Sequence, residues 1–143
     1  MSLFRVFDIA STGMSAQNAR LNTTASNLAN VDSVGSSKDT TYRAKEAVFA
    51  STLNNIRRDP FAFDDGAAAG VEIKEIINND SELQMRYQPS HPKANEDGYI
   101  FMPNVDTVAE MANMISASRS YQTNTEVFQT AKTLIQKTLE LGK

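Results

Sequence analysis

Residues 3–31 have the sequence LFRVFDIASTGMSAQNARLNTTASNLANV, which contains the strongest structural pattern of the chain. Large apolar side chains recur in it at every seventh position, at Phe7, Met14, Leu21 and Leu28. This heptad spacing is typical of a helix that packs along a second helix. Because the stretch contains no proline, we expect a helix over about residues 3–30, roughly 42 Å long at about 1.5 Å per residue.

Charge is distributed unevenly along the 143 residues. Residues 1–31 and 107–143 carry 10 charged residues among 68, whereas residues 32–106 carry 21 among 75. A solvated helix normally has a charged outer face, and these end segments have Ser, Thr, Asn, Gln and Ala there instead. The N-terminal helix could dock on its own domain or on another subunit, and its lack of charge favours another subunit.

The C-terminal segment predicts a second long helix. After Pro103, Thr107 and Glu110 fit a capping box, and neither proline nor glycine follows until Gly142, which we expect to end the helix. One apolar stripe holds Val108, Met111 and Ile115, and a second holds Val127, Leu134 and Leu141. The stripes lie about a quarter-turn apart. The helix therefore either kinks or presents different faces to different neighbours.

The charged middle predicts a small β-rich insert. Residues 71–77, 83–87 and 99–102 alternate as strands do, and residues 42–49 could form a strand or a helical turn. We therefore expect a mainly α protein with a small β insert (α+β), in which two long terminal helices form a coiled-coil-like core and three to four short strands lie between them. The expected segments are an N-terminal axial helix (1–31), a loop and β-rich insert (32–104) and a C-terminal axial helix (105–143).

The composition offers little for catalysis. The chain has no Cys and one His, and its formal net charge is −3. His91 lies in a turn-like segment between two prolines, and Asp64 and Asp65 lie on a Gly/Ala-rich loop. We expect no enzyme, no cofactor and no metal site, and the slightly acidic charge excludes a typical nucleic-acid partner. No apolar run approaches about 18 residues, so we expect no membrane insertion, and we expect no cleavable signal peptide.

Several motifs make the chain similar to a known family. Ala-Ser-Asn-Leu-Ala-Asn-Val at residues 25–31 resembles the N-terminal signature of the bacterial flagellar axial proteins of rod and hook. Residues 32–34, 42–45, 102–106, 110–111, 116–122, 124 and 137–142 look like those of proximal-rod subunits. The resemblance covers both terminal segments and patches of the middle, but not residues 50–70. After Asn30 the chain departs from the Thr and Gly-Tyr or Gly-Phe of many axial relatives, in agreement with the proximal-rod subtype.

The resemblance implies a structural subunit of the flagellar proximal rod, which assembles helically and transmits torque from the membrane ring to the distal rod and hook. The implied partners are other proximal and distal rod subunits, the adaptor between the MS ring and the rod, copies of the chain itself and, transiently, the type III export apparatus. The implied location is the basal-body rod in the periplasm. Two alternatives are another type III-exported axial or rod-assembly protein and a coiled-coil binding module.

Two groups of residues are expected to form the assembly site. The helix-packing group comprises Leu3, Phe7, Met14, Leu21, Leu28, Val31, Val108, Met111, Ile115, Val127, Leu134 and Leu141. The group expected to fix helix ends and register through polar contacts comprises Asn27, Asn30, Asp32, Arg119 and Asn124. We expect Phe7, Met14, Leu21 and Leu28 to pack against the C-terminal helix between residues 127 and 141, in the same subunit or in a neighbour.

Overall fold

The computed structural model describes residues 3–52 and 70–141, with side-chain burial given from residue 5. The elements follow in the order α1 (Leu3–Ala29), β1 (Lys45–Thr52), β2 (Gly70–Asn78), β3 (Gln84–Tyr87), β4 (Tyr99–Met102) and α2 (Thr107–Leu141). The predicted mainly helical α+β class with four short strands is confirmed. The segment at residues 42–49, left open between strand and helical turn, contributes strand β1.

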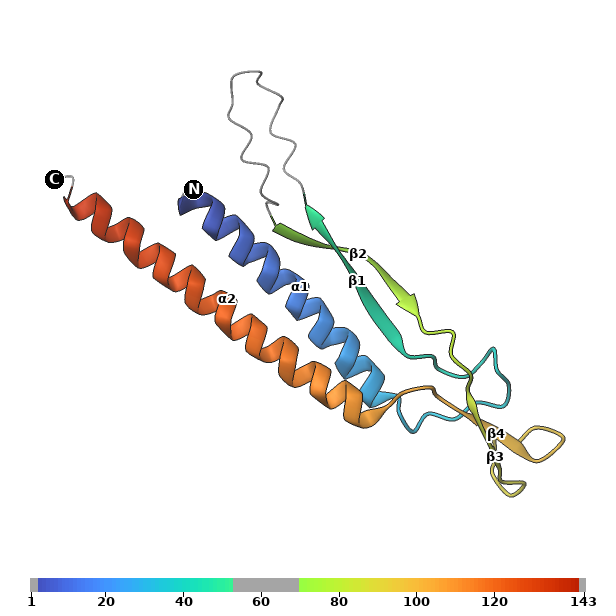
Figure 1. The fold of residues 1–143 in the computed structure, drawn as a ribbon. Coiled ribbons are helices and arrows are strands. Elements are labelled where there is room, and N and C mark those ends of the chain that lie inside the picture. The colour runs from blue at the N-terminus through green and yellow to red at the C-terminus, as the bar shows by residue number, and fades with distance from the viewer. Residues whose placement is uncertain (1–2, 53–69, 142–143) are drawn as a thin grey trace, which may run out of the picture.

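The two helices form an antiparallel hairpin, shown in Figure 1. Near the start of α1 the Phe7 ring packs edge-on against Phe128, with ring centroids 4.7 Å apart. Further along, Arg20 Nη2 donates a hydrogen bond of 2.9 Å to Asn113 Oδ1. Because α2 has 35 residues and α1 has 27, the C-terminal end of α2 extends beyond the start of α1.

Small side chains let the two helices approach closely. Ala117 and Ala131 are the buried residues of α2, and Ala10 is buried on α1. A Cβ placed on Gly13 would lie 2.8 Å from Asn124 Nδ2. α2 runs as one continuous helix without a sharp kink, so its two apolar stripes occupy different faces of a single helix.

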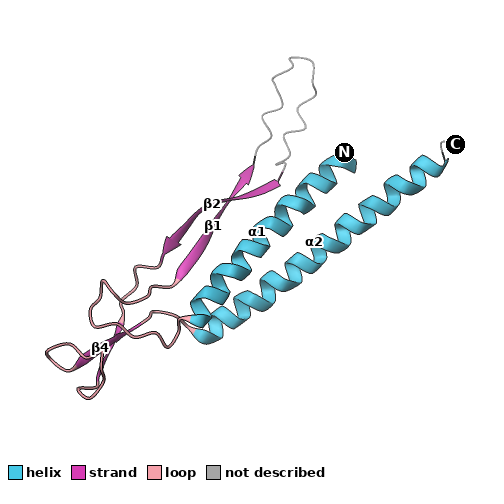
Figure 2. Cartoon of the chain, turned by 180° about the vertical axis from the view of Figure 1, so that it is seen from behind, coloured by secondary structure: helices cyan, strands magenta, loops and turns pink. Residues whose placement is uncertain are grey.

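Strands β1 and β2 form an antiparallel ribbon that lies on α1 on the side away from α2. Their pairing runs from Lys45 opposite Asn78 to Thr52 opposite Gly70, with a register shift between Val48 and Phe49. Figures 1 and 2 show the resulting three layers of α2, α1 and ribbon. Gly70 is buried against Thr12 of α1, whose Oγ1 accepts a hydrogen bond from Val71 N.

Strands β3 and β4 form a second hairpin beyond the closed end of the helix pair. Ile100 and Phe101 of β4 are buried there together with Leu83. The loop after α1 joins this hairpin because Gly35 and Phe101 exchange both backbone hydrogen bonds, each 3.0 Å long. A second small core therefore lies at the closed end of the helical hairpin.

The predicted start of α2 was wrong in one respect. Asp106 caps the helix, because its Oδ1 accepts hydrogen bonds from Val108 N at 2.9 Å and Ala109 N at 3.2 Å. Thr107 is already the first helical residue, so the predicted Thr107–Glu110 capping box does not form. The predicted terminator Gly142 and the Asp64–Asp65 pair lie outside the described residues.

Candidate assembly site

Asn27 is the polar centre of the closed end of the helical hairpin. Its side chain is 1% exposed. Nδ2 donates to Lys45 O at 2.9 Å and to Glu110 Oε1 at 3.0 Å. Oδ1 accepts from Lys45 N at 2.9 Å and from Tyr42 Oη at 3.0 Å. These four bonds use the full capacity of an amide side chain, and they join α1, the start of β1 and α2.

The other four predicted polar residues differ in their surroundings. Asn30 Nδ2 donates to Ser26 O at 2.8 Å, which satisfies a carbonyl in the last turn of α1. Asn124 lies against Gly13. Asp32 and Arg119 are exposed, and their side chains make no hydrogen bond or ion pair to any residue in the described ranges. A role for these two residues in assembly stays a prediction.

The predicted packing residues of α1 are partly covered within one chain. Phe7, Met14, Leu21, Leu28 and Val31 are half-buried, and the side chain of Leu3 lies outside the description. The four of these residues that lie in α1, Phe7, Met14, Leu21 and Leu28, therefore keep some surface that the rest of the chain leaves exposed.

The predicted packing residues of α2 are far more exposed. Val108 is 77% exposed and Leu141 is 88% exposed, and the four members between them also lie on the surface: Met111, Ile115, Val127 and Leu134. Large apolar surfaces of this kind mark sites of protein–protein contact.

The antiparallel register limits what Leu21 and Leu28 can reach. Their helical neighbours Arg20 and Asn27 bond to Asn113 and Glu110, more than ten residues before Val127. Packing of Leu21 and Leu28 against residues 127–141 of the same subunit is therefore wrong. Phe7 does reach that region through Phe128. The version in which a neighbouring subunit supplies the contact stays a prediction.

The residues that complete the Asn27 cluster were not predicted as site residues. Tyr42 lies just before β1, Lys45 is the first residue of β1 and Glu110 lies in α2, and a heptad pattern identifies only large apolar positions. Thr23 and Thr24 are also buried on α1. Glu110 could have been recognised as a site residue from the sequence, because α2 has no other acidic residue before Glu126.

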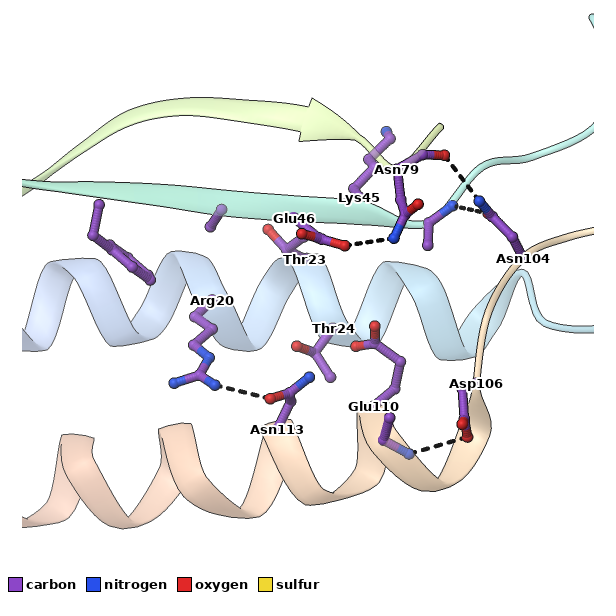
Figure 3. Close-up of a pocket in the computed structure, with 14 residues that line it drawn as sticks. Arg20, Thr23, Thr24, Lys45, Glu46, Asn79, Asn104, Asp106, Glu110 and Asn113 are labelled. Carbon is purple, nitrogen blue, oxygen red and sulfur yellow. Dashed lines mark hydrogen bonds between the residues drawn. The ribbon is translucent and has the colours of Figure 1, made fainter. Parts of the chain in front are cut away.

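A groove of about 520 Å³ lies next to this cluster, between α1, β1 and the start of α2. Asn79 Nδ2 donates to Glu46 Oε1 at 2.7 Å on one wall, and Asn104 bonds to Ala44 N and Asn79 O, both at 2.8 Å. Figure 3 shows Glu46, Asp106 and Glu110 around the groove. The groove is thus bordered by carboxylates that belong to the charged middle and to the start of α2.

The described residues hold neither a cluster of metal ligands nor a membrane-spanning helix. Within residues 3–52 and 70–141, no three His, Asp or Glu side chains are grouped so that they could hold a metal ion. Neither α1 nor α2, as far as they are described, has an apolar stretch long enough to cross a membrane.

Comparison with known proteins defines the class of this chain. Residues 7–35 match the family model described as flagella basal body rod protein, and residues 96–141 match the model described as flagellar basal body rod FlgEFG protein C-terminal. These ranges hold most of α1 and all of α2. The fold and these matches define a flagellar rod protein.

Full-length relatives make the assignment more specific. The chain is 46% identical to the flagellar basal-body rod protein FlgC of Yersinia enterocolitica and 45% identical to that of Escherichia coli O157:H7, over all of each chain. It is 35% identical to FlgC of Borreliella burgdorferi over 99% of this chain and 98% of the relative. The chain belongs to the FlgC family and is a structural subunit of the flagellar rod. The resemblance found in the sequence is confirmed.

Proposed function

We propose that this chain is a proximal-rod subunit that assembles helically and carries torque from the membrane ring toward the distal rod and hook. Its proposed partners are copies of itself, other proximal and distal rod subunits, and the adaptor between the MS ring and the rod. It acts without catalysis, in the periplasmic part of the basal body. The type III export apparatus delivers it there.

The three segments of the chain have different proposed roles in the rod. Residues 1–31 and 105–143 supply the axial helices, and the described parts of residues 32–104 lie along α1 and at the closed end of the helical hairpin, outside the helix pair (Figure 1). The scarcity of charge in the helices supports this division, because each unpaired charge buried between subunits would cost desolvation energy. Neutral amides and hydroxyls can form hydrogen bonds to a neighbour at much lower cost.

The observation that supports assembly most directly is the exposed stripe of Val108, Met111 and Ile115. These side chains are 77%, 53% and 55% exposed. They lie on the face of α2 opposite the face that packs on α1. A helical subunit with this face free gains stability when a neighbour covers it, at about 25 cal/mol per Å² of apolar surface removed from water.

A triple substitution tests the proposal. Val108→Ser, Met111→Ser and Ile115→Ser together are expected to leave the single chain folded, because these side chains are exposed in it. Expressed in the native bacterium without the chromosomal copy, the variant is expected to abolish swimming and to be absent from purified basal bodies. The matched control replaces Gln129, Thr133 and Gln136 by Ser on the same helix and is expected to assemble normally. Normal rods built from the apolar triple variant would contradict the proposal.

A further inference from the structure

We propose, resting on the function above, that Met111 is a modification site through which peroxides control assembly. Oxidation of its thioether to the sulfoxide places a polar group in the middle of the exposed apolar stripe of α2. A subunit that carries this sulfoxide is excluded from the rod. The oxidant is a small peroxide that is free in solution, with hydrogen peroxide as the simplest member of the class.

Met111 is one of two methionines that are exposed in the described part of the chain. Its exposed fraction is 53%, and that of Met85 on β3 is 61%. Met14 is half-buried, and its sulfur accepts a hydrogen bond of 3.4 Å from Thr125 Oγ1. The remaining described methionines are also half-buried: Met102 and Met114. Because oxidation of methionine requires access to the sulfur, a peroxide in solution should react at Met85 and Met111 first.

The position of Met111 gives its oxidation a consequence for assembly. Val108 lies three residues before it and Ile115 lies four residues after it, so the three side chains share one helix face. Both neighbours are aliphatic and cannot donate a hydrogen bond. An oxygen added to Met111 therefore finds no donor within the stripe. When another subunit covers the stripe, the oxidised side chain opposes the contact by the desolvation cost of this acceptor.

The chemistry needs no group other than the thioether and the peroxide. A lone pair of the Met111 sulfur attacks one oxygen of hydrogen peroxide, so that an S–O bond forms and the O–O bond breaks. The departing hydroxide takes the proton of the transferred hydroxyl group and leaves as water. The sulfur is oxidised by two electrons, and the peroxide is reduced. The product is a polar sulfoxide in place of a flexible apolar side chain, a change that disrupts contact surfaces containing methionine.

The same geometry protects subunits that have already assembled. In the free chain both Met85 and Met111 are accessible. In a rod, the neighbour that covers the stripe also covers the thioether of Met111. Oxidation at Met111 therefore acts on subunits that are waiting to assemble, whereas completed rods keep the apolar form.

Selective resistance of rod assembly to peroxide tests the proposal. Three strains of the native bacterium express the natural chain, Met111→Leu or the matched control Met85→Leu, and build new rods with or without a sublethal dose of hydrogen peroxide. Incorporation into purified basal bodies is compared with the untreated culture of the same strain. Peroxide is expected to lower incorporation by about fivefold or more for the natural chain and for Met85→Leu, and by less than about twofold for Met111→Leu. Unchanged incorporation of the natural chain, or equal losses in all three strains, would overturn the proposal.

Mass spectrometry provides the second measurement, in case Met111→Leu hinders assembly by itself. The purified chain and purified basal bodies receive the same dose of peroxide, and the sulfoxide is quantified at Met111 and at Met85. Met111 is expected to be oxidised about tenfold more slowly in basal bodies than in the purified chain. Absence of Met111 sulfoxide from the treated purified chain would overturn the modification site. Equal oxidation of Met111 in both samples would instead overturn the proposed role of the stripe in assembly.

Discussion

The two ends of the helical hairpin are built on opposite principles. At the closed end, Asn27 is 1% exposed and its amide makes four hydrogen bonds that join three segments. At the open end, α2 extends beyond the described part of α1 (Figure 1), and Leu139 and Leu141 are 68% and 88% exposed. The amide of Asn27 at the closed end therefore has all its partners within one chain, whereas the leucines at the open end stay exposed in one chain.

This difference separates folding from assembly. A buried amide with every bond made fixes the register of the two helices, because a shift of one residue would leave several polar groups without partners. Exposed leucines contribute little to the folded single chain and gain stability when another subunit covers them. Substitutions at the closed end should therefore change stability, and substitutions at the open end should change assembly.

The largest loss of stability is expected for Asn27→Asp. A carboxylate accepts hydrogen bonds but cannot donate to Lys45 O, and it would face the carboxylate of Glu110 where Asn27 Nδ2 now lies 3.0 Å from it. Breaking a buried polar network in this way costs about 3–5 kcal/mol. Urea unfolding of the purified chain at pH 7 measures it. The deficit should shrink near pH 4, because a protonated carboxyl can donate again.

Asn22→Asp is the matched control for Asn27→Asp. Asn22 lies on the same helix, is exposed, and donates to Asn18 Oδ1 at 3.0 Å. Its replacement should change the free energy of unfolding by less than about 0.5 kcal/mol. Equal effects from the two substitutions would mean that the Asn27 cluster does not hold the closed end together.

Two pairs of leucines test the separation of folding from assembly directly. Leu21→Ala with Leu28→Ala is expected to cost about 2–4 kcal/mol in the single chain, since both side chains are half-buried on α1. Leu139→Ala with Leu141→Ala should cost less than about 0.5 kcal/mol. Both pairs should reduce incorporation into basal bodies. Normal incorporation of the Leu139→Ala and Leu141→Ala variant would show that the open end is not part of the assembly surface.

Sequence periodicity anticipated most of the fold. The heptad at Phe7 to Leu28 and the uninterrupted run from residue 107 to residue 141 gave two helices whose ends agree closely with α1 and α2. Strand β4 was expected at the residues where it occurs, because Asp97-Gly98 is a turn pair directly before it. In the structure Gly98 has a φ of +82°, which glycine tolerates.

The candidate site was harder to read because its contacts join distant residues. Asn27 was expected to make polar contacts, but its partners lie 15, 18 and 83 residues away. Heptad spacing also cannot tell whether two helices in one chain run with residue 21 beside residue 113 or beside residue 134. That choice is fixed by the antiparallel turn at the closed end, which depends on Tyr42, Lys45 and Glu110 together.

A smaller loss is expected for Gly35→Ala at the closed end. A Cβ there would lie 3.0 Å from the backbone N and Cα of Thr41 and closer still to its Oγ1, so backbone must move. Gly35 also exchanges two hydrogen bonds with Phe101. We expect a cost of about 1–3 kcal/mol in urea unfolding. Ser36→Ala, at the exposed next residue, is the control and should be nearly neutral; a neutral Gly35→Ala would show that this loop adapts freely.

The smallest change is expected for Gly13→Ala, where two effects oppose each other. Replacing glycine by alanine inside a helix stabilises it by about 1 kcal/mol. Against this, the new Cβ would lie 2.8 Å from Asn124 Nδ2, which is the movable end of a side chain and not backbone. The net change in urea unfolding should therefore stay within about 1 kcal/mol of zero. Adding Asn124→Ala to Gly13→Ala removes the obstacle, so the double variant should be more stable than Asn124→Ala alone. If Gly13→Ala costs as much in the absence of Asn124 as in its presence, the close approach of the two helix backbones, and not the Asn124 side chain, requires glycine at this position.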